Sequence, residues 1–242
     1  MGAVTDLTRV DVLAIGPHPD DIEIGLGGIT AKHAALGHLV GLCDLTAGEM
    51  GTIGTVEERL AEAEAARVVL GAAWRVNLRL PDRGIGGDPV QVRAVASLIR
   101  QTRPLVVAAP YWSDRHPDHV SASQLITEAV FSAGLRRYDA DGDPWRPTRL
   151  CYYFLNEAAP PSFVVDVSDY YAVKQRAIAC HATQFGQLSS EAAETRVTPT
   201  RFRQLIESRD LQFGAQIGVA YAEGLVVRHP VVAPHLMDGL TR

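Results

Sequence analysis

Apolar and polar positions along the chain fall into blocks that predict buried strands separated by helices. Apolar runs typical of strands lie at 12–15, 38–45, 75–80 and 105–109. Between them, apolar residues recur at helical spacing in 24–36, 55–70 and 88–102. Strands that alternate with helices are typical of βαβ units, so we predict an α/β fold around a parallel sheet.

Capping residues set several of the predicted helix ends. Thr55 with Glu58 forms a capping box and Gly71 ends that helix, while Asp88 followed by Pro89 begins the next one. The later chain is predicted to hold helices at 120–133, 169–181 and 200–221, strands at 150–155 and 163–167, and a polar flap at 186–197. Residues 225–242 are Pro-rich and receive no assignment. We find no linker and expect a single domain over 1–242.

Two short motifs place histidine and aspartate directly after predicted strands. His18-Pro19-Asp20-Asp21 follows the run 12–15, and His116-Pro117-Asp118-His119 follows the run 105–109. Ligands bind at the carboxyl ends of strands in α/β sheets. One such motif alone could simply cap a helix with Asp20 or Asp21. Two similar corners predict one shared site.

The spacing within each motif suits a metal ion. His18 and Asp21, and likewise His116 and His119, are three residues apart and can lie on one face of a first helical turn. Catalytic zinc commonly takes three such ligands and keeps a fourth position open, whereas four protein ligands would make a closed, structural site. The strand-end position favours three ligands, with the fourth residue left for chemistry.

Composition and charge limit the classes of partner that the chain is expected to bind. The net charge is -5 and no basic cluster is present, which argues against nucleic acid or an anionic membrane as partner. The amino terminus lacks a signal-like pattern and no apolar run approaches the ~20 residues of a membrane span, so we expect a cytoplasmic protein. Three scattered cysteines, without CxxC spacing, predict buried thiols rather than disulfides or metal ligands.

With these motifs, the chain resembles the LmbE-like or PIG-L family of zinc-dependent N-acetylglucosaminyl deacetylases. The likeness extends through Cys43-Asp44-Leu45-Thr46, Leu80-Pro81-Asp82 and Tyr221-Ala222-Glu223-Gly224. It looks closest to the bacillithiol-biosynthesis branch, which acts on N-acetylglucosaminyl malate. The resemblance implies a Rossmann-like, doubly wound, mostly parallel sheet with helices on both faces, and a homo-oligomer, often a hexamer.

Carried over by position, the resemblance implies one Zn²⁺ held by His18, Asp21 and His119. It also implies a general base, a catalytic histidine oriented by a carboxylate, and an arginine on the substrate carbonyl: Asp20, His116, Asp118 and Arg59. The same donor types accept Fe²⁺, cobalt or manganese, so the native metal is open.

These roles predict metal-assisted amide hydrolysis of an amino-sugar substrate. Zinc lowers the pKa of a bound water toward ~7, and Asp20 takes its proton. Zinc and protonated His116, with Arg59 nearby, stabilise the oxyanion, and either Asp20 or His116 protonates the leaving amine. For the substrate, Glu49 is a candidate for a sugar hydroxyl and Arg115 for malate, although Glu49 could be solvated and Arg115 could pair with a neighbouring aspartate.

Three alternatives stay open. Deacetylation of another N-acetylglucosamine conjugate, such as diacetylchitobiose, fits the same residues. A nucleotide-binding module fits the βαβ opening, but Gly25-Leu26-Gly27-Gly28 is not GxGxxG and the carboxylates would repel a pyrophosphate. A two-metal phosphoesterase would need a bridging carboxylate and further ligands.

Overall fold

The sheet has the predicted parallel core and an antiparallel edge. In this computed structural model, which describes residues 7–186, 199–232 and 235, seven strands form one sheet in the order β3-β2-β1-β4-β5-β7-β6. Neighbours from β3 to β5 are parallel, and β7 is antiparallel to both β5 and β6. The strands are β1 (Val12–Gly16), β2 (Val40–Thr46), β3 (Trp74–Leu80), β4 (Val106–Pro110), β5 (Arg149–Tyr153), β6 (Phe163–Asp166) and β7 (Ala222–Val226).

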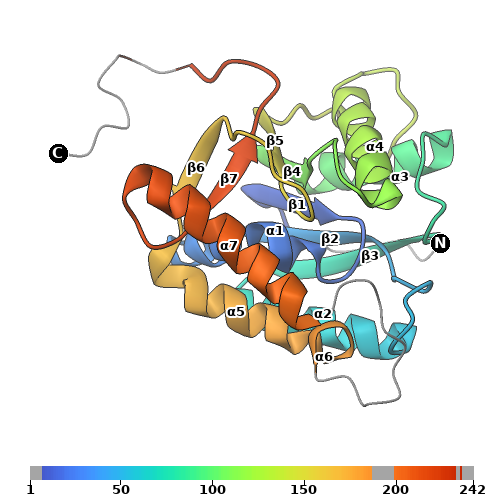
Figure 1. Cartoon of the computed structure of the whole chain (residues 1–242). Coiled ribbons are helices and arrows are strands. Elements are labelled where there is room, and N and C mark those ends of the chain that lie inside the picture. Colours follow the sequence, from blue (N-terminus) through green and yellow to red (C-terminus); the bar gives the residue numbers. More distant parts are fainter. Residues whose placement is uncertain (1–6, 187–198, 233–234, 236–242) are drawn as a thin grey trace.

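Helices cover both faces of the sheet (Figure 1). Along β1, Leu13 and Ile15 point into the core beneath α3 and α4, whereas Ala14 points into the core beneath α1, α2 and α5. This alternation confirms the doubly wound α/β fold. The helices are α1 (Asp21–Ala35), α2 (Val56–Leu70), α3 (Pro89–Thr102), α4 (Pro117–Ala133), α5 (Tyr171–Cys180), α6 (Ala182–Phe185) and α7 (Pro199–Ile217), with a 3₁₀ turn η1 (Ser168–Tyr170) before α5.

The predicted caps are confirmed. The Thr55 hydroxyl accepts from the Glu58 amide while the Glu58 carboxylate accepts from the Thr55 amide, and Gly71 ends α2 in a left-handed conformation. Asp88 caps α3. Several boundaries differ by a few residues. The first helix begins at Asp21 rather than residue 24, α4 begins at Pro117 rather than residue 120 because the His116 ring caps it, and α7 ends at Ile217 rather than residue 221.

The sequence analysis did not predict β7. Ala222–Val226 is fully buried between β5 and β6, and its apolar run is interrupted by the charged residue Glu223. Its charge is compensated by Lys174, which is distant in sequence. Of the predicted flap at 186–197, only Gly186 lies within the described residues.

The order of the strands places the two motifs beside each other. From β1 the chain proceeds to β2 and β3 on one side, and from β4 to β5 on the other. The adjacent pair β1 and β4 is therefore the topological switch point, where neighbouring connections leave in opposite directions and open a crevice. His18 follows β1 and His116 follows β4, so both corners border this crevice.

Candidate active site

The first corner turns sharply between β1 and α1. Asp20 precedes the helix with φ of 124°, a conformation that side chains rarely adopt. The Asp21 carboxylate accepts from the backbone amide of His18 at 3.0 Å, and Asp21 begins the helix. The strained turn directs the carboxylates of two successive residues toward the crevice, and such strain is typical of functional sites.

The second corner supplies two histidines. His116 caps α4, accepting a hydrogen bond at Nδ1 from the Asp118 amide at 3.2 Å, and His119 follows within the first turn. The His116 and His119 rings stack with centroids 4.6 Å apart. Across the crevice, the His18 ring lies 5.0 Å from the His116 ring and 5.8 Å from the His119 ring.

The two corners meet around one point. One ligand atom from each of His18, Asp21 and His119 lies within 4.8 Å of the other two, and all three side chains are buried. A second set, His18 with His116 and Asp118, meets the same distance limit. Both sets share His18, so the structure brings the two motifs into a single potential metal centre.

The ring nitrogens indicate that the first set suits a metal ion. His18 presents Nδ1 to Asp21 at 3.1 Å, and His119 presents Nε2 to Asp21 at 3.5 Å. The opposite nitrogens face other carboxylates: His18 Nε2 lies 3.3 Å from Asp82 and from Asp118, and His119 Nδ1 lies 3.1 Å from Asp114. Metal-binding histidines usually donate their outer N–H to such a carboxylate. The donor set therefore fits a divalent cation.

Asp20 is beside this centre and reachable from outside. Its side chain is 14% exposed, and Arg59 Nη2 lies 3.7 Å from Oδ2. Burial raises the pKa of Asp20 to about 6, with the Asp21 charge adding to the rise and the Arg59 charge opposing it. A carboxylate in this state can both accept and return a proton near neutral pH.

Arg59 is buried and fixed by backbone oxygens. Its guanidinium donates to the backbone oxygens of Gly48 at 2.8 Å and Pro19 at 3.0 Å, which ties α2 to the Gly-rich loop at 47–55 and to the first corner. The arginine therefore holds the turn that carries Asp20. Its Nε is buried without a hydrogen-bond partner in the described part of the chain.

Asp118 contacts different groups from those the resemblance implied. We expected its carboxylate to orient His116, but the carboxylate lies against His18 Nε2 and accepts from Arg83 at 2.9 Å, while only its backbone amide reaches His116. The pKa of His116 is lowered by burial and by the two neighbouring histidines.

The two substrate candidates lie on exposed loops. Glu49 accepts from the Asp82 amide at 2.7 Å, so it joins the Gly-rich loop to the loop after β3 and is not simply solvated. Arg115 is exposed and, within the described residues, forms no ion pair with Asp114 or Asp82. Its guanidinium is available to a ligand.

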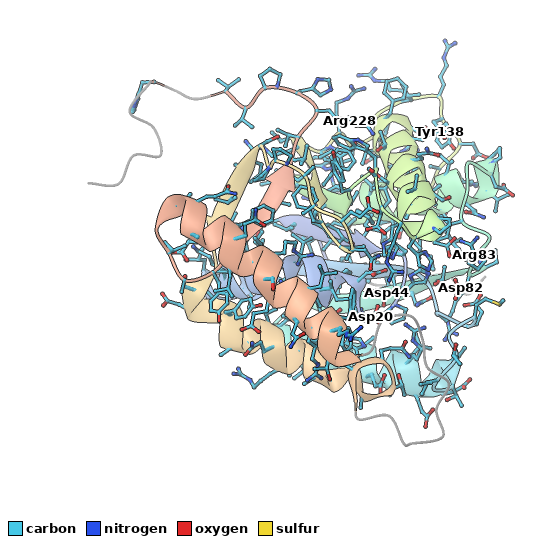
Figure 2. All side chains as sticks on the ribbon, in the orientation of Figure 1. Asp20, Asp44, Asp82, Arg83, Tyr138 and Arg228 are labelled. Carbon is cyan, nitrogen blue, oxygen red and sulfur yellow. The ribbon has the colours of Figure 1, made fainter. Side chains whose placement is uncertain are left out.

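Four residues at the site were not singled out from the sequence. Asp82, Arg83, Asp114 and Asn156 come from loops after three different strands. Asp114 accepts from His116 and Asn156 amides as well as facing His119. Figure 2 shows Asp20, Asp82 and Arg83 gathered in the region between α4 and α2. The only signal in the sequence is position, since Asp82 lies within a family segment and Asp114 lies just before the second motif.

Comparison with known proteins finds a deacetylase family and individual deacetylases that are similar to this chain. Residues 13–130 match the family described as PIG-L: GlcNAc-PI de-N-acetylase. A diacetylchitobiose deacetylase from Thermococcus kodakarensis is 33% identical over 88% of this chain and 81% of its own length. A 1D-myo-inositol 2-acetamido-2-deoxy-alpha-D-glucopyranoside deacetylase from Segniliparus rotundus is 29% identical over 84% of this chain and 87% of its own length.

A solved structure has the same fold as this chain. The conserved protein TT1542 from Thermus thermophilus superposes with a TM-score of 0.85 at 39% identity, covering 93% of this chain and 97% of that one. The fold and these matches define a metal-dependent deacetylase. The chain belongs to the PIG-L family. The relatives named above are an inositol-conjugate and a disaccharide deacetylase, not bacillithiol enzymes.

Proposed function

We propose that this chain hydrolyses the acetamide of an N-acetylglucosamine conjugate at a divalent metal held by His18, Asp21 and His119. The observation that carries the proposal is the convergence of these three ligand atoms within 4.8 Å at the switch point of the sheet. A bound divalent cation lowers the pKa of water and withdraws charge from an acyl oxygen. The remaining chemistry belongs to the side chains around it.

Asp20 is proposed as the general base. It lies in the same turn as His18, is not one of the three ligands, and has a side chain that is 14% exposed. It removes the proton from the attacking water and can return it to the departing amine. Arg59 holds Asp20 in place through the Pro19 carbonyl and through its own 3.7 Å contact with the Asp20 carboxylate. Its role on the substrate carbonyl stays part of the proposal.

His116 is proposed to stabilise the developing oxyanion. Its Nδ1 accepts from the Asp118 amide, so any proton on the ring resides at Nε2, available to the substrate oxygen or the amine. Positioned donors of this kind contribute most of the stabilisation in acyl transfer.

The aglycone is the finer part of the proposal. Malate attached to the sugar would bring two carboxylates to the site. Arg115 is exposed, and Arg83, which pairs with Asp118, is 49% exposed, so both guanidinium groups are accessible to these carboxylates. These two arginines support N-acetylglucosaminyl malate. The names of the relatives support instead a neutral partner such as inositol or a second glucosamine.

The deciding experiment measures acetate release from N-acetylglucosaminyl malate, diacetylchitobiose and the inositol conjugate side by side. We expect activity to disappear after chelation and to return with Zn²⁺ or Fe²⁺. Activity that persists in chelated protein with no bound metal would refute the mechanism. A preference for either neutral conjugate would refute the malate assignment alone.

A further inference from the structure

A cavity lies at the opposite end of the sheet from the active site. Its volume is about 150 Å³, and it is lined by the first residues of four parallel strands, Val12, Val40, Val106 and Arg149. The proposed active site is at the other, carboxyl ends of these strands. The deacetylase reaction therefore makes no use of this cavity.

The register of the strands explains why there is space. Ala14 of β1 pairs with Ala108 of β4, which pairs with Cys151 of β5, so three small side chains lie in a row beneath α1. Leu26 and Ile29 of α1 form the opposite wall. Apolar side chains supply most of the lining, and a space of about 150 Å³ is large enough for a benzene-sized molecule.

Arg149 and His33 are polar members of the cavity lining. Arg149 is exposed and forms no ion pair within the described residues, and its guanidinium carbon lies 6.0 Å from the centre of the Phe163 ring, which also lines the cavity. His33 Nδ1 is buried with no hydrogen-bond partner in the described part of the chain.

We propose that this cavity binds a small aromatic carboxylic acid. The ring occupies the space between α1 and the row of Ala14, Ala108 and Cys151, and the carboxylate meets the guanidinium of Arg149. An arginine fork and an apolar body of benzene size together select an aromatic acid over a neutral arene or a larger lipid.

Calorimetric titration of the metal-loaded full chain tests the proposal, with benzoate as probe and benzyl alcohol as a neutral probe of the same size. We expect saturable one-to-one binding of benzoate. Arg149→Gln should weaken benzoate binding about 10-fold or more, as expected for a lost charge-assisted hydrogen bond, and leave benzyl alcohol binding unchanged. Absence of saturable benzoate binding, or an equal loss for both probes, would overturn the proposal.

A carboxylate is also able to bind at the active site. A variant that fills the cavity distinguishes benzoate binding in the cavity from benzoate binding there. Cys151→Phe should abolish benzoate binding and retain deacetylase activity, which also reports that the variant folds. If Cys151→Phe fails to fold, Ala108→Val serves in its place and should weaken binding. Benzoate binding that survives in the folded, filled variant and disappears on chelation would place the acid at the metal centre and contradict the inference.

Discussion

Both histidines of the candidate metal set are held at both ring nitrogens. One nitrogen of His18 and one of His119 face Asp21, and the other nitrogens face Asp82 with Asp118, and Asp114, respectively. Carboxylates at both nitrogens fix the orientation of each ring before any metal arrives. Asp21 is the carboxylate that the two rings share, and Asp20 next to it is the proposed general base.

Asp20→Asn should retain the metal and lose turnover. An amide has nearly the same shape but cannot accept the proton, and loss of a positioned base typically costs about 10²- to 10⁴-fold in rate. Metal content by mass spectrometry and acetate release measured on the same sample check this. The neighbouring variant Asp21→Asn should instead lose metal. If Asp20→Asn lost the metal, Asp20 would be a ligand.

Asp114→Asn should lower the affinity of the site for its metal ion. The His119 Nδ1 would lose its carboxylate partner at 3.1 Å, and removal of such a partner typically lowers metal affinity about 10- to 100-fold. Competition with a chelator measures the affinity. Asp139→Asn is the matched control, since Asp139 pairs with Arg93 on the surface. Equal affinity in the wild type and Asp114→Asn would show that Asp114 only caps the loop.

The sequence predicted which side chains of the two motifs meet. It did not predict the residues of other loops that contact these side chains. His18, Asp21 and His119 follow apolar runs at fixed spacing, so the ends of β1 and β4 bring them together. Asp82 belongs to the loop after β3, which is not adjacent to β1. Its contact with His18 depends on the path of that loop, and no local pattern specifies such a path.

At the scale of elements, α1 approaches the sheet closely because its glycines permit it. A Cβ on Gly25 would lie 2.2 Å from Tyr153 Cδ2 and 2.9 Å from the Phe154 carbonyl oxygen. Tyr153 cannot easily move, since it is buried and its hydroxyl donates to the Ile15 carbonyl at 2.9 Å. The close approach positions Asp21, the first residue of α1, against His119.

Gly25→Ala should destabilise the protein and reduce activity. Overpacking costs about 1–3 kcal/mol, which exceeds the gain of up to about 1 kcal/mol from the better helix former, and α1 must shift away from β5. Urea denaturation measures the stability and acetate release the activity. Gly86→Ala is the control, because a Cβ there meets nothing within 4 Å. Unchanged stability in Gly25→Ala would mean that Tyr153 adapts.

The helices and strands were predicted where local signals agreed. The capping box at Thr55 and the Asp88-Pro89 start fixed two helix ends because their partners lie within three residues. β7 has no such signal, since Glu223 becomes acceptable in a central strand only through Lys174 and the amides of Gly28 and Ile29. A buried charge is interpretable only once its distant partner is known.

At the scale of the whole molecule, one buried ionic cluster joins the carboxyl-terminal part of the chain to α1. Lys174 of α5 contacts Asp210 of α7 at 2.6 Å and Glu223 of β7 at 2.7 Å. Arg209 Nη2 donates to the Ile24 carbonyl, while Glu223 accepts from amides of the same helix. The cluster therefore connects α5, α7 and β7 to the helix that begins at the active site.

Lys174→Met should destabilise the protein by about 3–5 kcal/mol, because it leaves buried Asp210 and Glu223 without their cation. Urea denaturation measures the loss, and Arg93→Gln, which breaks an exposed pair with Asp139, should change stability by less than about 0.5 kcal/mol. Adding Asp210→Asn and Glu223→Gln to Lys174→Met should recover much of the loss, since neutral groups no longer need a counter-charge. Without such recovery, the packing of the lysine stem rather than uncompensated charge would account for the role of Lys174.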